Sequence, residues 1–116
     1  LQIPNLIILG HSNCGGVEYS YKTLLDKKNI NDFEYINQWT SCLQNSYNNI
    51  PNDLPETEKI TFFEQENIKQ SIKNLREYDF IDKSINENKL NVVGLWYQIN
   101  SGLIKFLDNN SFIDLD

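Results

Sequence analysis

A strand, a loop and the start of a helix follow one another in Asn5-Leu6-Ile7-Ile8-Leu9-Gly10-His11-Ser12-Asn13-Cys14-Gly15-Gly16. The first half is a short, continuous apolar run bounded by Pro4 and Gly10, which predicts a strand buried on both faces, the type found in parallel sheets. From Gly16 onward the apolar residues take up helical spacing. Because a buried parallel strand needs helices on both sides, this order predicts an α/β fold.

The rest of the chain supplies further helices and a hairpin. Apolar residues in steps of three or four over 33–50 predict a second helix of about 15 to 18 residues, with Asp32 as its N-cap. Similar spacing predicts a third helix over 57–78 and a short fourth helix over 81–88. Two apolar runs joined by Asn100-Ser101-Gly102 predict a β-hairpin over 90–107.

The length of the chain, 116 residues, allows one domain over 1–116. About three strands cannot make the fully covered parallel sheet that the first strand requires. The chain also contains no Met and opens with Leu1 in the lead-in to a strand. We therefore expect a C-terminal portion of a longer chain, whose missing strands come from residues before Leu1 or from a partner chain.

The composition excludes several classes of function. The net charge is −6, and Arg76 is the only arginine, so a nucleic-acid partner is not expected. No apolar run approaches the roughly 18 residues of a membrane span, and no signal peptide opens the chain. Two cysteines without a repeated pattern fit a reducing compartment, so the cytoplasm is the expected location.

The loop after the first strand carries the candidate chemistry. It holds the only histidine of the chain, His11, three residues before Cys14. Ligands of open α/β sheets gather at the C-terminal ends of the strands, where this loop begins. Imidazole and thiolate are ligands that Zn²⁺ prefers, and a loop of this length can bring both to one ion. His11 and Cys14 are therefore candidate zinc ligands, although a catalytic zinc site needs a third protein ligand.

The segment from Leu6 to Val17 resembles the zinc loop of the β-class carbonic anhydrases, in which a strand, Gly-His-Ser-x-Cys-Gly-Gly and a helix follow in this order. Three later segments resemble the family in the same order along the chain. They are Asn37-Gln38-Trp39, then Asn67-Ile68 with Ile72 and Asn74-Leu75, then Gly94, Tyr97, Ile99, Gly102 and Leu107-Asp108. The resemblance implies a β-carbonic-anhydrase-like α/β fold: a central, mostly parallel sheet flanked by helices, incomplete at the N-terminus, with a C-terminal β-hairpin.

The same resemblance implies a zinc lyase that hydrates carbon dioxide reversibly to bicarbonate and a proton through a zinc-bound hydroxide. His11 and Cys14 would be zinc ligands, and the zinc-loop residues around them would be Gly10, Ser12, Gly15 and Gly16. The family's Asp-Arg pair and its other thiolate lie in an upstream Cys-x-Asp-Ser-Arg segment, which no residue of this chain matches. The catalytic residues are therefore unknown here, and the chain alone is expected to be inactive. The family implies a homodimer or tetramer acting on a small-molecule substrate. No membrane partner is expected, because no apolar run is long enough to cross a membrane.

Two other interpretations stay open. The chain can be a catalytically incomplete remnant or truncated paralogue that acts only as a folding or interaction module. It can also belong to a related carbon disulfide or carbonyl sulfide hydrolase, because such enzymes share this loop and fold. An upstream Cys-x-Asp-Ser-Arg segment in the full-length sequence would favour the enzyme over the remnant.

Other prominent side chains are expected to be structural. Cys42, beside Leu43 in the middle of the second helix, is expected to be a small buried apolar residue rather than a ligand. Four aromatic residues are expected in the core or in a subunit interface: Trp39, Trp96, Phe62 and Phe63. Four acidic residues are expected to form a solvated helix face: Glu56, Glu58, Glu64 and Glu66.

Overall fold

The structure, a computed structural model, describes residues 2–26 and 34–115. The chain divides into two compact units, one made of Leu1–Ser12 with Ile68–Asp116 and the other of Asn13–Asn67. Helix α4 (Glu56–Arg76) contributes residues to both units. That residues 1–116 form one domain stays a prediction. The predicted N-cap Asp32 and the first apolar residue of that predicted helix, Phe33, lie outside the described residues.

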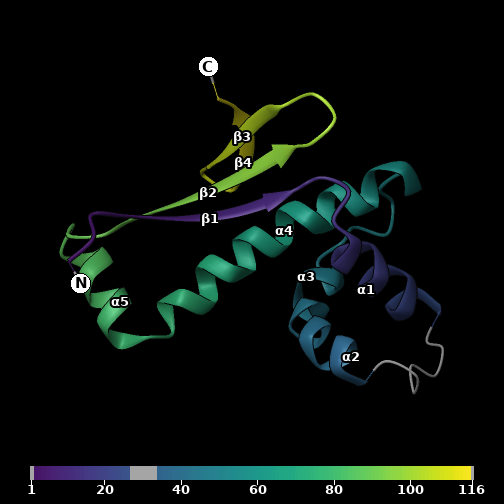
Figure 1. Cartoon of the computed structure of the whole chain (residues 1–116), viewed down its shortest axis with the longest axis horizontal. Coiled ribbons are helices and arrows are strands. Elements are labelled where there is room, and N and C mark those ends of the chain that lie inside the picture. The colour runs from purple at the N-terminus through teal and green to yellow at the C-terminus, as the bar shows by residue number, and fades with distance from the viewer. Residues whose placement is uncertain (1, 27–33, 116) are drawn as a thin grey trace. The chain divides into compact units, whose positions relative to one another are not determined.

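The first unit contains a sheet with the strand order β1-β2-β3-β4 (Figure 1). Its strands are β1 (Asn5–His11), β2 (Asn91–Gln98), β3 (Leu103–Asp108) and β4 (Ser111–Asp114). β1 runs parallel to β2, and the two later pairs are antiparallel, so the sheet of the described residues is mixed. The predicted hairpin is confirmed as β2 and β3. β4 was not predicted, although the turn before it has two adjacent residues with positive φ, Asn109 and Asn110, which is typical of a tight hairpin.

Strand β1 lies at the edge of this sheet, and its burial alternates along the strand. Ile7 is 57% exposed and Leu9 is 63% exposed, whereas Leu6 and Ile8 are half-buried. The prediction of a strand buried on both faces is therefore wrong for the described residues, because only one face of β1 is covered. The parallel pairing that the same run predicted is confirmed.

Helix α4 packs on the sheet where β2 carries Gly94. A Cβ atom placed on Gly94 would lie 3.0 Å from Cγ2 of Ile68 and 3.2 Å from Cδ1 of Ile72, so the absence of a side chain lets the helix approach closely. The next helix, α5 (Asp79–Asn86), is tied to the end of α4 by Arg76, whose Nε donates to Oδ1 of Asp82 at 2.9 Å. The two helices predicted over 57–78 and 81–88 are thus confirmed, with ends shifted by one or two residues.

The second unit is helical. It holds α1 (Gly15–Asp26), α2 (Glu34–Thr40), the 3₁₀ helix η1 (Ser41–Leu43), α3 (Gln44–Asn48) and the first part of α4. The single helix predicted over 33–50 is broken into three pieces. Thr40 Oγ1 donates to the Ile36 carbonyl at 2.8 Å and Ser41 Oγ donates to the Gln38 carbonyl at 2.6 Å. Such side-chain bonds compete with the helical main-chain pattern, which accounts for the 3₁₀ turn at this point.

Because of this 3₁₀ turn, the buried side chains differ from those expected for a continuous helix over 33–50. Leu43 is buried while Cys42 is exposed, so the prediction of a buried Cys42 is wrong. Trp39 is 69% exposed and does not belong to the core of the described residues. Its place in a subunit interface stays a prediction. Phe63 and Trp96 are buried as predicted, and Phe62 is half-buried.

The core of the second unit is aromatic. Val17, Tyr21, Leu43 and Phe63 form its buried cluster. The ring centroid of Phe63 lies 6.5 Å from that of Tyr21 and 5.9 Å from that of Tyr47, within the range of favourable aromatic pairs. Helices α1, α3 and α4 therefore meet through one set of rings.

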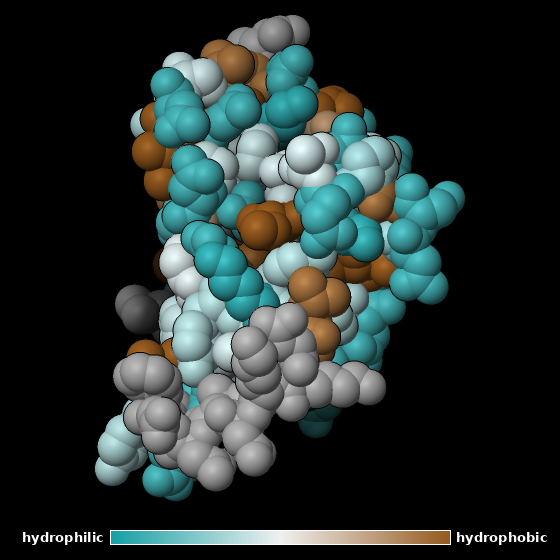
Figure 2. Space-filling model, turned by 90° about the vertical axis from the view of Figure 1, so that its right-hand side faces the viewer, coloured by the Kyte–Doolittle hydropathy of each residue, from teal (hydrophilic) through white to brown (hydrophobic). Residues whose placement is uncertain are grey.

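The surface is mainly hydrophilic, in agreement with the polar composition of the chain. Hydrophilic residues predominate on the face in Figure 2, with apolar residues scattered among them. None of the helices within the described residues combines the length and the apolar character needed to cross a membrane.

Tyr21 couples the stability of the fold to alkaline pH. The pKa of Tyr21 is raised to about 12, mainly because the side chain is buried. The hydrogen bond that its hydroxyl donates to the Glu56 carboxylate, and the negative charge of that carboxylate, also contribute to this rise in the pKa. An unfolded tyrosine ionises near pH 10, so this contribution to stability is complete below about pH 10 and is lost as the pH rises through about 12. We expect Tyr21→Phe to flatten the fall in the free energy of unfolding over that range, measured by urea titration. Tyr35→Phe, at a side chain that is 85% exposed, is the control, and equal slopes in the two variants would contradict this expectation.

Candidate metal centre

Strand β1 carries His11 to the C-terminal end of the parallel pair, where it lies opposite Tyr97. Two hydrogen bonds continue the pairing beyond it: Ser12 N–H donates to the Tyr97 carbonyl and Ile99 N–H donates to Ser12 Oγ, both at 2.9 Å. The predicted zinc-loop residue Ser12 therefore fastens the start of the loop to the hairpin. The half-buried Gly10 lies opposite Trp96 within the same pair of strands.

The ring of His11 is held in one orientation. Its Nδ1 donates to the carbonyl oxygen of Ser12 at 2.8 Å. Because a carbonyl oxygen can only accept, Nδ1 carries the proton and Nε2 of the neutral ring keeps its lone pair. Metal-binding histidines are usually oriented by such a bond from the nitrogen that does not bind the metal. His11 thus presents Nε2 as a donor suited to a metal ion.

Cys14 belongs to the second unit, immediately before α1. The chain reaches it through Asn13, whose φ of 56° lies in the left-handed region that asparagine tolerates. The Cys14 carbonyl accepts the Glu18 N–H at 2.9 Å, which starts the helix. The side chain is a free thiol, half-buried against the core cluster. Local structure thus places a thiol at the head of α1.

The two glycines after Cys14 have different surroundings. A Cβ atom on Gly16 would lie 2.8 Å from Cζ3 of Trp39, so this glycine makes room for the indole ring beside α1. A Cβ atom on Gly15 would have no atom within 4 Å among its described surroundings. Of the predicted pair, only Gly16 is required by a close approach in the described residues.

The acidic residues of α4 were predicted to form a solvated face, but one of them is buried and hydrogen-bonded. Glu64 is 4% exposed, and its Oε1 accepts the N–H of Cys14 at 3.2 Å. The prediction of a solvated face is therefore wrong at Glu64. Its spacing could have shown this, since Glu64 lies four residues after Ile60 and four before Ile68 on the buried stripe.

Two other carboxylates of α4 also have hydrogen-bond or ion-pair partners, although they are more exposed than Glu64. Glu66 accepts from Nδ2 of Asn49 at 3.0 Å. Glu56 accepts from the Tyr21 hydroxyl and pairs with Lys59 at 3.1 Å. The hydrogen bond from Tyr21, followed by that from Lys59, lowers the pKa of Glu56. Glu58 is exposed, as predicted.

The donor chemistry of the loop fits zinc, but the ligand set is partial. Within residues 2–26 and 34–115, no group of three or more His, Cys, Asp or Glu side chains is placed to hold a metal ion. His11 offers an imidazole nitrogen and Cys14 a sulfur, which are zinc's preferred donors. Cys42 lies in η1, where its thiol donates to the Trp39 carbonyl at 3.1 Å. The loop thus holds two candidate ligands, and their joint coordination of zinc stays a prediction.

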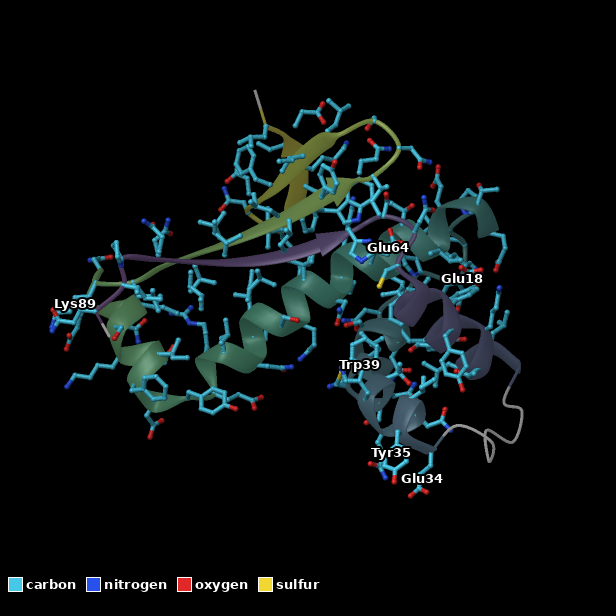
Figure 3. The ribbon with its side chains drawn as sticks, in the orientation of Figure 1. Glu18, Glu34, Tyr35, Trp39, Glu64 and Lys89 are labelled. Atoms are coloured by element: carbon cyan, nitrogen blue, oxygen red, sulfur yellow. The ribbon has the colours of Figure 1, made fainter. Side chains whose placement is uncertain are left out.

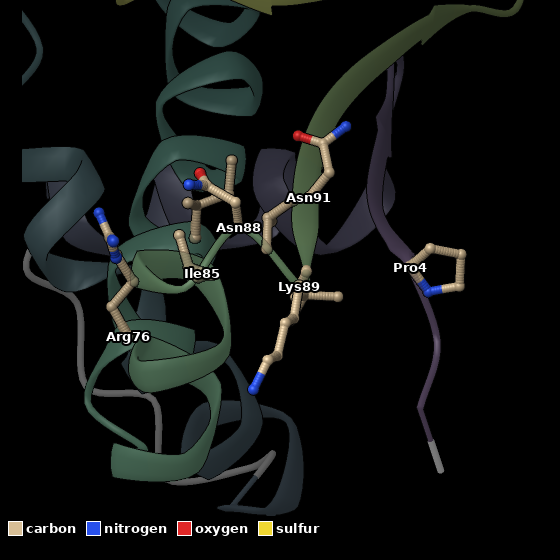
Figure 4. Close-up of a pocket in the computed structure, with 9 residues that line it drawn as sticks. Pro4, Arg76, Ile85, Asn88, Lys89 and Asn91 are labelled. Carbon is tan, nitrogen blue, oxygen red and sulfur yellow. The ribbon is translucent and has the colours of Figure 1, made fainter.

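A separate cavity of about 390 Å³ lies in the first unit (Figure 4). Its lining includes Pro4, Arg76, Lys89 and Asn91. Pro4 and Asn91 mark the N-terminal ends of β1 and β2, whereas His11 ends β1. A strand of this length spans about 20 Å, so the cavity and His11 lie at opposite ends of the parallel pair.

Comparison with known proteins finds a matching family profile and relatives that carry the same family name. The carbonic anhydrase family profile matches residues 1–104. Beta carbonic anhydrase 3 of Arabidopsis thaliana is 28% identical over 105 residues, covering 88% of this chain and 40% of that protein. A carbonic anhydrase of Helicobacter pylori is 30% identical over 108 residues, covering 88% of this chain and 48% of that protein. The chain thus spans less than half the length of these two relatives.

Solved structures show the same fold. The β-carbonic anhydrase CafA of Aspergillus fumigatus superposes with a TM-score of 0.74 at 25% identity, over 91% of this chain and 49% of that one. Two tetrameric β-carbonic anhydrases are described for Sordaria macrospora, and a chain from that work superposes with a TM-score of 0.72 at 24% identity, over 98% of this chain and 55% of that one.

The parallel pair, the closing hairpin and the histidine-to-cysteine loop define a β-carbonic-anhydrase fold. The chain belongs to the carbonic anhydrase family, and within it to the β class.

Proposed function

We propose that the natural protein is a zinc-dependent carbonic anhydrase, which hydrates carbon dioxide reversibly to bicarbonate and a proton. The observation that carries the proposal is the state of His11, whose Nδ1 is committed to the Ser12 carbonyl while Nε2 keeps its lone pair. His11 lies at the C-terminal end of the parallel strand β1, three residues before the free thiol of Cys14. The carbonic anhydrases related to the chain support the same reaction class.

In this proposal His11 and Cys14 hold the zinc ion together with ligands from outside the described residues. Zinc, when bound, acts as a Lewis acid that makes a water molecule a strong nucleophile near neutral pH. Ser12 orients the first of these two residues: its carbonyl accepts a hydrogen bond from the His11 imidazole, and its hydroxyl accepts one from Ile99 N–H, which fastens the start of the loop. The remaining ligand and an Asp-Arg pair are expected in a Cys-x-Asp-Ser-Arg segment of the natural protein.

We also propose that the protein works as a homodimer or tetramer in the cytoplasm, without a nucleic-acid or membrane partner. The tetrameric state described for the Sordaria macrospora enzymes supports assembly, as do exposed apolar side chains such as Ile7, Leu9 and Trp39. Both cysteines are free thiols, which fits a reducing compartment.

A second candidate is a catalytically incomplete remnant that serves only as a folding or interaction module. The full-length sequence separates the two candidates, because the enzyme needs a Cys-x-Asp-Ser-Arg segment that such a remnant would lack. Related carbon disulfide and carbonyl sulfide hydrolases are a further alternative, which assays with those substrates would separate from a carbonic anhydrase.

Zinc content per chain tests the proposal. Elemental analysis under reducing conditions is expected to find about one zinc ion per chain in the natural protein and little in the isolated chain described here, since two ligands bind zinc weakly. Carbon dioxide hydration should follow zinc content and disappear with a chelator. A natural protein without zinc would support the remnant, and zinc-dependent hydration by the isolated chain would contradict the need for further ligands.

A further inference from the structure

Glu64 is a buried carboxylate whose position needs an explanation. It lies on α4 next to Phe63, which is fully buried, and its own side chain is 4% exposed. Burial of a carboxylate costs free energy unless hydrogen bonds compensate for the lost water. Figure 3 shows Glu64 on α4 beside the start of α1, and its Oε1 accepts the main-chain N–H of Cys14 at 3.2 Å.

This bond restrains the main chain at the proposed zinc ligand. The N–H groups at the start of a helix have no partner within the helix, so Cys14 N–H needs an acceptor from elsewhere. Glu64 supplies it from 50 residues away in the sequence. On either side of Cys14, Asn13 has a left-handed backbone and Gly15 has no side chain to pack. The carboxylate therefore ties this part of the loop to a long helix.

We propose that Glu64 is a positioning residue for the metal centre: by accepting the Cys14 N–H, its carboxylate fixes the main chain at Cys14 so that the sulfur meets the zinc ion. This inference rests on the proposed function, because it requires Cys14 to be a zinc ligand. Glu64 acts through the main chain of Cys14 and does not touch the metal.

Two substitutions separate the hydrogen bond from packing. Glu64→Gln keeps a carbonyl acceptor of the same length, and Glu64→Met keeps the size of the side chain but has no comparable acceptor. Glu58→Met is the matched control, because Glu58 is exposed on the same helix. If Glu64→Met does not unfold cooperatively, Glu64→Asp replaces it, since one methylene fewer draws the acceptor away from the Cys14 N–H.

The first measurement uses the natural protein with Co²⁺ in place of zinc. The absorption band between cobalt and thiolate reports that sulfur binds the metal, the part of the band lost in Cys14→Ser belongs to the Cys14 sulfur, and competition with a chelator gives the dissociation constant. We expect Glu64→Met to weaken cobalt binding about 10-fold to 100-fold, the usual effect of removing a partner that orients a ligand. Glu64→Gln is expected to lose less than about 10-fold, because it retains a weaker, neutral hydrogen bond, and Glu58→Met should match the parent.

The second measurement needs no metal. Alkylation by iodoacetamide, followed by peptide mass spectrometry, is expected to be faster at Cys14 in Glu64→Met than in the parent or in Glu64→Gln. Cys42, which is exposed in a different element, is the internal reference and should react at the same rate in each protein.

The outcomes distinguish the two proposals. A natural protein that shows no cobalt-thiolate band overturns the proposed function, and this inference with it. If the parent shows the band and Glu64→Met binds cobalt as tightly, only the role of Glu64 is overturned. Equal losses in Glu64→Gln and Glu64→Met also overturn it, because an acceptor would then not be the property that matters.

Discussion

Replacing His11 by Ala in the natural protein is expected to remove zinc and to lower carbon dioxide hydration by more than about 100-fold. The loss of a ligand should exceed the 10-fold to 100-fold effect of removing a partner that only orients one, and the reaction depends on the metal. Zinc content by elemental analysis and initial hydration rates by stopped flow would measure the two effects. Both should fall together, because His11 is exposed at the end of β1 and its loss removes no core contact.

Cys14→Ser is expected to behave in the same way, since a serine hydroxyl is a poor replacement for a thiolate in a zinc site. Cys42→Ser is the matched control: it makes the same chemical change at an exposed cysteine in η1 and should leave zinc content and rate unchanged. Full activity in Cys14→Ser would show that Cys14 is not a ligand. An equal loss in Cys42→Ser would show that the effect of the change is not specific to the loop.

Phe63→Ala is expected to lower the free energy of unfolding by about 3–5 kcal/mol, the usual cost of truncating a buried aromatic side chain. Phe63 has no exposed surface, and its ring packs against those of Tyr21 and Tyr47, which also pack against each other. Its removal leaves a cavity where α1, α3 and α4 meet. Urea unfolding followed by circular dichroism, at one fixed protein concentration, would measure the change.

Phe80→Ala provides the comparison for that experiment, because this phenylalanine is 71% exposed on α5. It is expected to change stability by less than about 1 kcal/mol, as surface substitutions usually do. If Phe63→Ala were no more destabilising than Phe80→Ala, the ring cluster would not be the core of the second unit.

Much of the fold could be predicted from local pattern. The apolar run of β1, the helical spacing of α4 and the hairpin signal Asn100-Ser101-Gly102 each depend on residues close together in the sequence. Patterns of this kind reflect the period of the element itself, and the structure confirms these elements. The predicted helix over 33–50 is different, because hydroxyl groups at Thr40 and Ser41 bond to the main chain and interrupt it. Apolar spacing does not register such bonds.

The candidate site, like the fold, could be predicted only in part. His11 and Cys14 could be identified from residue type, spacing and resemblance, but nothing in the loop indicates the role of Glu64. Its partner lies 50 residues away, and a rule that places charged residues on the surface led to the wrong prediction. The rule that places cysteine inside likewise failed at Cys42, which is exposed.

The sequence alone determined the strand-loop-helix order, the hairpin and the two candidate metal ligands of the loop, because each depends on residue type and short spacing. It also indicated the family, through motifs that follow in order along the chain. Tertiary packing determined that β1 is an edge strand of the described sheet and that a buried carboxylate accepts the main-chain N–H of Cys14. These features depend on which distant segments meet, and the free energy of burying Glu64 depends on finding the Cys14 N–H. Local periodicity contains no information about that encounter.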